Sequence, residues 1–146
     1  SIGVAFNPYL PDFLFNEELL RLRKKLGTGL VRSIWIQFGT DYKLLKRRIN
    51  ILSNIISTHI TNNSKISNIL IYGSILIPSR QFLSRFKFRP WKGVYCSSEF
   101  LESVDFANKI VIELLEIYKK YNISPIIETK ISTEDDLNKM KRILRL

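Results

Sequence analysis

The stretch SIWIQFGTDY, residues 33–42, contains a change from strand to helix. Its first half is β-branched and aromatic, and together with the two residues before it this predicts a strand over residues 31–38. Asp41 precedes a long amphipathic run and is typical of a helix N-cap. Gln37 does not fit a buried strand, because it is an amide between two apolar residues at the carboxyl end of the run. Its position raises the question of what it binds.

The same alternation of strand and helix extends in both directions from this stretch. Further strands are predicted at residues 2–6, 66–76 and 124–129. Helices are predicted at residues 15–26 with Asn16 as N-cap, 41–60, a short one from Ser79, 98–121, and a last one from Ser132 or Thr133. The middle strands are apolar at nearly every position, so we expect helices to cover both faces of the sheet.

The order of elements predicts the α/β class with parallel (βα) units in a single domain, residues 1–146. Two architectures fit this order. One is a doubly wound sheet, and the other is half of a (βα)8 TIM-type barrel, since a whole barrel takes about 250 residues. The chain begins at Ser1 rather than Met, so we expect a fragment or a processed product of a longer protein.

The composition narrows the possible partners and compartments. The formal net charge is +10, which favours an anionic partner. The chain has one cysteine, Cys96, so it forms no internal disulfide, and a cytoplasmic location is expected. No apolar run approaches the roughly 18 residues of a membrane span, so no membrane association is expected. With one histidine, His59, and one cysteine, no metal site is expected.

Polar residues at the carboxyl ends of parallel strands are the first candidates for a site. These are Asn7, Tyr9, Gln37, Asp41, Ser74, Ser79, Glu128, Thr129 and Lys130. Gln37 suits a heterocycle, because an amide both donates and accepts hydrogen bonds, but it could equally bond a neighbouring loop. Glu128 could be an acid or base, or could pair with Lys130. Cys96 has no histidine nearby in the sequence and is interpreted as a structural thiol.

Several of these segments, in order, resemble the flavin-dependent methylenetetrahydrofolate reductases. The segments are VAFNPYLPD (4–12), EELLRLRKKLGTG (17–29), SIWIQFGTD (33–41), GSILIPSRQFL (73–83), and RPWKGV (89–94) with a long helix and IIET (126–129) after it. They match the family's fifth strand and its loop, the helix after that strand, the strand carrying its glutamine, a Pro-Gly-Ile-Leu-Pro segment, and the stretch before the eighth strand. The resemblance implies that the chain is units 5–8, the C-terminal half of the barrel.

The resemblance also implies an activity and its residues. NAD(P)H would reduce FAD, and 5,10-methylenetetrahydrofolate would be reduced to 5-methyltetrahydrofolate, a reaction of one-carbon and methionine metabolism. Gln37 and Phe82 would bind the folate substrate. Asn7, Glu18, Arg21 and Lys25 would bind FAD, although Asn7 and Arg21 stand where the family has tyrosine and asparagine. The catalytic general acid is expected in the N-terminal half, which this chain lacks.

Two other functions fit parts of the sequence. A non-catalytic half-barrel that binds a ligand or partner is the main alternative, and its exposed seam would make a homo-oligomer. The segment RFKFRPW (85–91) interleaves aromatic and basic residues as single-strand nucleic-acid binders do, but such a cluster at a helix end more often closes a core. Nucleic acid is therefore not the expected partner.

Overall fold

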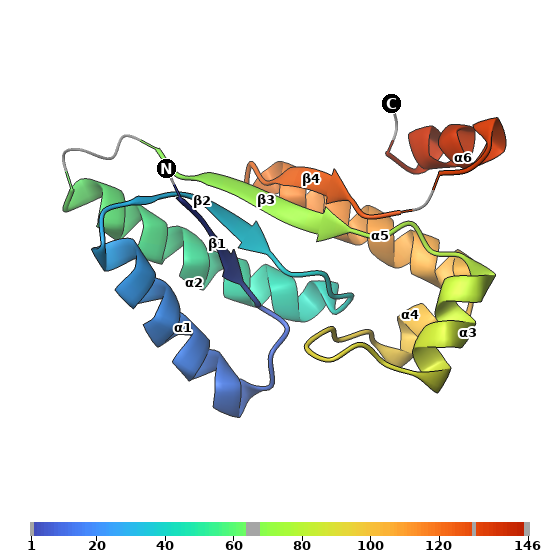
Figure 1. Ribbon diagram of the computed structural model, residues 1–146, viewed down its shortest axis with the longest axis horizontal. Helices are drawn as coiled ribbons and strands as arrows, with labels where there is room; N and C mark the ends of the chain where they lie inside the picture. The colour runs from blue at the N-terminus through green and yellow to red at the C-terminus, as the bar shows by residue number, and fades with distance from the viewer. Residues whose placement is uncertain (1, 64–67, 130, 145–146) are drawn as a thin grey trace.

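The computed structural model describes residues 2–63, 68–129 and 131–144. Strands and helices alternate along these ranges (Figure 1). Their order is β1 (Ile2–Phe6), α1 (Asp12–Gly27), β2 (Val31–Ile36), α2 (Tyr42–Thr61), β3 (Leu70–Ile75), α3 (Arg80–Phe88), α4 (Ser98–Glu102), α5 (Val104–Lys120), β4 (Ser124–Ile127) and α6 (Glu134–Leu144). Within the described ranges, no helix combines the length and apolarity that crossing a membrane requires.

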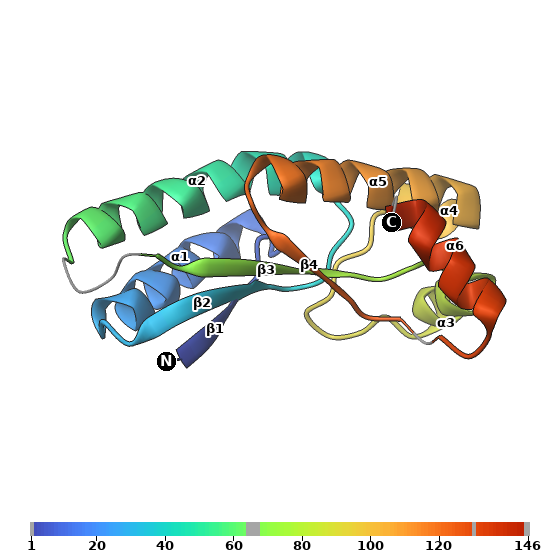
Figure 2. The same cartoon turned by 90° about the horizontal axis from the view of Figure 1, so that it is seen from above.

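The four strands form one parallel sheet in the order β1-β2-β3-β4. Each strand thus pairs with the next in sequence, and a right-handed crossover at every step leaves the connecting helices on the same face. Helices α1, α2 and α5 do lie on one side of the sheet (Figure 2). This arrangement is half of a (βα) barrel, which confirms the predicted fold class and excludes the doubly wound alternative. It is an open sheet, not a closed barrel.

The prediction that helices cover both faces of the sheet is wrong. On β2, Ile34 and Ile36 face the helices and are buried, whereas Trp35 between them is 46% exposed. Trp35 packs against Tyr72 of β3 on the uncovered face, with ring centroids 4.9 Å apart and planes tilted by 34°. The apolar sequence of β2 therefore does not mean that both faces are buried. Its aliphatic residues face the helices, and its aromatic residue lies on the exposed face of the sheet.

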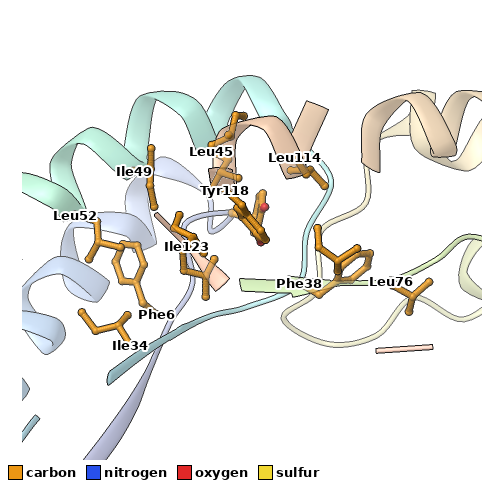
Figure 3. Packing of buried hydrophobic residues seen from close by; sticks show 14 of the residues in the cluster. Phe6, Ile34, Phe38, Leu45, Ile49, Leu52, Leu76, Leu114, Tyr118 and Ile123 are labelled. Atoms are coloured by element: carbon orange, nitrogen blue, oxygen red, sulfur yellow. The ribbon is translucent and has the colours of Figure 1, made fainter. Parts of the chain in front are cut away.

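The main core lies between the sheet and helices α1, α2 and α5 (Figure 3). Its central members from the strands are Phe6 and Ile34, and those from the helices include Leu45, Leu114 and Tyr118. Tyr118 fits against the sheet only because residue 73 is glycine, since a Cβ there would lie 2.3 Å from the tyrosine ring. Helix α5 and strand β3 therefore approach one another closely.

Helix boundaries agree with the sequence where a side chain caps the helix. Asp41 accepts from the Leu44 N–H at 2.8 Å, and Ser79 accepts from the Phe82 N–H at 3.1 Å, both as predicted. Thr133 and Asp136 likewise bond each other's backbone N–H groups, which confirms a capping box opening at Thr133.

Two helix predictions are wrong. Helix α1 begins at Asp12 after Pro11, so Asn16 lies inside it and caps nothing. The long helix predicted over residues 98–121 is two helices, because Ser103 is extended (φ −152°, ψ 163°). Its side chain accepts from the Phe106 N–H at 3.2 Å and starts a new helix there.

Candidate functional site

Gln37 lies one residue beyond the carboxyl end of β2. Its backbone N–H donates to the Phe6 carbonyl at 2.9 Å, which continues the ladder between β1 and β2. Its side chain is exposed and makes no hydrogen bond with any residue that the structure describes. Among the described residues, the Gln37 amide therefore does not bond a neighbouring loop, which was the alternative interpretation. Both the donor and the acceptor of Gln37 are open to a ligand.

Phe82 belongs to an aromatic cluster beside the strand ends. Its ring contacts Phe86, Trp91, Phe38 and Phe100 at centroid distances of 5.7, 5.5, 6.4 and 6.5 Å. Phe38 follows Gln37 directly, so the cluster adjoins the carboxyl end of β2. Within RFKFRPW, Phe86 is buried in this cluster and closes the core, whereas Trp91 is 51% exposed and Phe88 is 92% exposed.

A cleft of about 750 Å³ opens at the carboxyl ends of β3 and β4, between α3 and α6. This volume is in the range of small-molecule sites. Its apolar wall is formed by Phe82, Phe86 and Trp91, and Arg85 and Glu128 contribute charged groups. The structure thus places Phe82 in a cleft at the predicted edge of the sheet. Gln37 is not among the lining residues of the cleft; it lies just past the end of the neighbouring strand β2.

Glu128 and Ser74 form a hydrogen-bonded pair at this edge. The Ser74 hydroxyl donates to the Glu128 carboxylate at 2.5 Å. Tyr118, from the helix side, donates its hydroxyl to the Ser74 carbonyl at 3.2 Å. The sequence suggested Lys130 as the partner of Glu128, and Lys130 lies outside the described residues. Within them, Glu128 has no salt bridge.

The predicted FAD-binding residues of the first unit gather at the end of β1. The Asn7 N–H donates to the Glu18 carboxylate at 2.9 Å, and the Arg21 guanidinium donates to it at 2.9 and 3.1 Å. The Asn7 side chain donates to the Gly93 carbonyl at 2.9 Å. Glu18 is buried, at 8% exposure, by these contacts. Asn7, Glu18 and Arg21 therefore form one cluster, in which the positive charge of Arg21 balances the negative charge of Glu18.

Lys25 has a role at the free edge of β1. Phe6 pairs with β2, so in a parallel ladder the alternate residues Ala5 and Asn7 direct their backbone groups away from β2. The Lys25 ammonium donates to the Ala5 carbonyl at 3.2 Å, and Glu18 accepts the Asn7 N–H. Two side chains of α1 thus satisfy the outer edge of β1, a common protection of exposed strand edges.

Arg48 is an important residue that the sequence did not single out. The run KLLKRR (43–48) reads as a solvated helix face, but Arg48 is only 4% exposed. Its guanidinium donates to the Pro8 and Leu10 carbonyls and to Asp12, and it stacks over the Phe15 ring at 3.8 Å. Position 48 lies next to the buried stripe of α2, a signal that could have revealed it. Arg48 fixes the loop between β1 and α1.

The remaining candidates for chemistry are the Cys96 thiol and clusters of possible metal ligands. Burial raises the pKa of the Cys96 thiol to about 12, against a smaller lowering by a hydrogen bond with Thr40. A thiol with a raised pKa stays protonated at neutral pH, which agrees with the interpretation of Cys96 as a structural thiol. Residues 2–63, 68–129 and 131–144 contain no group of three or more His, Cys, Asp or Glu that could hold a metal ion.

Comparison with known proteins does not identify a family. No protein-family model matches the chain, and no curated protein matches it.

Proposed function

We propose that the chain is the C-terminal half of a flavin-dependent reductase barrel of the methylenetetrahydrofolate reductase type, with its ligands at the carboxyl edge of the sheet. The observation that carries this proposal is Gln37, whose amide is exposed at the end of β2 with no side-chain partner among the described residues. Phe82, which contacts Phe38 next to Gln37 in the chain, presents an aromatic ring to a cleft of ligand size. An open amide beside an aromatic wall suits a flat heterocycle such as the pterin of a folate.

The residues assigned to FAD fit an anionic group in part. Arg21 and Lys25 are cations near the end of β1, and each has donors left after its contacts with Glu18 and Ala5. They would hold a pyrophosphate by charge-assisted hydrogen bonds. FAD, when bound, would supply the hydride transfer from NAD(P)H to methylenetetrahydrofolate. The role of the chain is then to bind and orient, with Gln37 holding the folate ring and Phe82 lying against it.

The test measures folate and FAD binding separately. Folate is titrated against the chain and against Gln37→Ala, with Asn54→Ala on the exposed side of α2 as the matched amide control. The proposal expects about a tenfold weaker folate affinity for Gln37→Ala only, because one well-placed amide contributes both a donor and an acceptor. Equal affinities for all three proteins would reject the assigned role of Gln37. FAD binding that Lys25→Met and Arg21→Met leave unchanged would reject the flavin assignment.

A second candidate, a non-catalytic half-barrel that binds a ligand or partner, is favoured by one observation. Glu18, Asn7 and Arg21 bind one another, and Lys25 covers the edge of β1, so these residues stabilise the fold without a cofactor. This candidate predicts folate binding through Gln37 with no flavin retained. It also expects self-association of the chain, which light scattering would detect as a mass above 17.1 kDa.

A further inference from the structure

The Glu128 carboxylate is held in a defined position at the carboxyl end of β4. Its backbone N–H donates to the Ile75 carbonyl at 2.7 Å, which ties the residue to β3. Its Oε1 accepts the Ser74 hydroxyl, and Ser74 is in turn tied to Tyr118 through its carbonyl. A carboxylate has about four acceptor sites, so several remain for a ligand in the cleft that Glu128 lines.

Glu128 forms no ion pair with any residue in the described part of the chain. Arg85 and Lys139 line the same cleft, yet neither forms a salt bridge with it. The other acid of the cleft, Asp136, uses its carboxylate to accept the N–H groups of Ser132 and Thr133. The Glu128 carboxylate, which accepts one hydrogen bond, therefore has more acceptor sites left for a ligand than that of Asp136, which accepts two.

The walls beside Glu128 are aromatic. Trp91 is half exposed and lies edge-on to Phe82, with centroids 5.5 Å apart and planes 70° apart. A flat ring can lie against such a wall while its edge meets the carboxylate. A carboxylate favours two parallel N–H donors, which it binds in a bidentate way.

We infer that Glu128 is a specificity-determining residue that accepts two adjacent N–H donors, an exocyclic amino group and a neighbouring ring N–H, from a flat heterocycle lying against Phe82 and Trp91. This inference rests on the proposed function for the location of the site, and adds a residue to it. Gln37 is two strands away from Glu128, a lateral separation of about 10 Å. The two side chains would therefore contact different edges or portions of one ligand.

The experiment uses two fluorescent probes that differ in the group that Glu128 would read. Pterin carries a 2-amino group next to a ring N–H, whereas lumazine has a carbonyl in place of the amino group. Affinities are measured by fluorescence anisotropy at a pH where both probes are neutral, for the wild-type chain, Glu128→Gln, Gln37→Ala and Ser74→Ala. Glu134→Gln, on α6 outside the cleft lining, removes the same charge and serves as the control.

The inference expects the wild-type chain to bind pterin about tenfold more tightly than lumazine. Glu128→Gln should abolish that preference, Ser74→Ala should reduce it, and Glu134→Gln should retain it. Because the readout is a ratio of two affinities, a general loss of folding would not imitate the result. A wild-type chain without preference, or a preference that Glu128→Gln keeps, would overturn the inference.

The same titrations separate this inference from the proposed function. If Gln37→Ala binds pterin as the wild type does, and no FAD is retained, the proposed function fails. A pterin preference that depends on Glu128 would still stand under that result. Conversely, a loss of binding in Gln37→Ala with no effect of Glu128→Gln would leave the proposed function standing and reject the role of Glu128.

Discussion

Replacing Gly73 by alanine tests how the core positions the candidate site. Gly73 lies in β3, next to Ser74, and the ring of Tyr118 packs directly against its backbone. A Cβ at residue 73 would lie 2.3, 2.4 and 2.6 Å from three atoms of the Tyr118 ring and hydroxyl. Carbon atoms pack at about 3.5–4.0 Å, so the tyrosine would have to move by about 1 Å or more.

The expected loss of stability has two parts. Overpacking of a buried site costs about 2 kcal/mol. Displacing Tyr118 also breaks the hydrogen bond from its hydroxyl to the Ser74 carbonyl, which contributes about 1 kcal/mol. The free energy of unfolding should therefore fall by about 3 kcal/mol, which corresponds to a decrease of about 10 °C in Tm for a chain of this size.

The assay is urea unfolding followed by circular dichroism, with a double-mutant cycle. In a Tyr118→Leu background the obstructing ring is absent, so Gly73→Ala should cost less than about 1 kcal/mol, a coupling of about 2 kcal/mol. Gly27→Ala is the control, since no atom lies within 4 Å of a Cβ at that position. An equal cost of Gly73→Ala in both backgrounds would show that the Tyr118 ring is not what a Cβ at residue 73 obstructs.

Three further predictions concern the loop, the ionisable core and the sheet edge. Arg48→Met should lower the free energy of unfolding by about 2–3 kcal/mol in urea, because it removes the donor from two loop carbonyls; a loss below about 1 kcal/mol would contradict this. Burial raises the pKa of Tyr9, Tyr118 and Cys96. Each group therefore contributes its full stabilisation at pH values below its ordinary pKa, and the free energy of unfolding should fall as the pH rises above that value. For Cys96 this range runs from pH 9.0 to about 12. Urea titrations across that range should show a shallower decline for Cys96→Ala than for the wild type, and equal slopes would count against it. Lys25→Met should change stability by less than about 1 kcal/mol but increase light scattering at high concentration, because it uncovers an edge carbonyl; unchanged scattering would argue against edge protection.

Local patterns predicted the four strands, several helix caps and the edge of the sheet where polar residues gather. Asp41 and Ser79 cap their helices because their side chains bond N–H groups three residues on, an interaction contained within a few residues of sequence. Such features depend on short-range geometry, and a single sequence can reveal them. Phe82, in contrast, was named only through the family resemblance, and no local pattern placed it beside the strand ends.

Features set by the whole chain could not be predicted in the same way. The exposure of Trp35 and the burial of Ile36 depend on which face of the sheet the crossover helices occupy, and the strand order decides that. Arg48 reads as one charge in a basic run until the loop of the first unit folds against it. Glu128 accepts a hydrogen bond from Ser74, which is 54 residues away in the sequence, so no local pattern could predict that pair.

The most direct test of the account is a two-dimensional amide NMR titration of the chain with folate. A ligand site at the carboxyl edge of the sheet predicts shifts of the side-chain NH2 signals of Gln37 and of the backbone amide signals of Phe82 and Glu128. Signals on the outer surfaces of α2 and α5 should not move. Shifts confined to those helices, or no shifts at saturating folate, would contradict a ligand site at this edge.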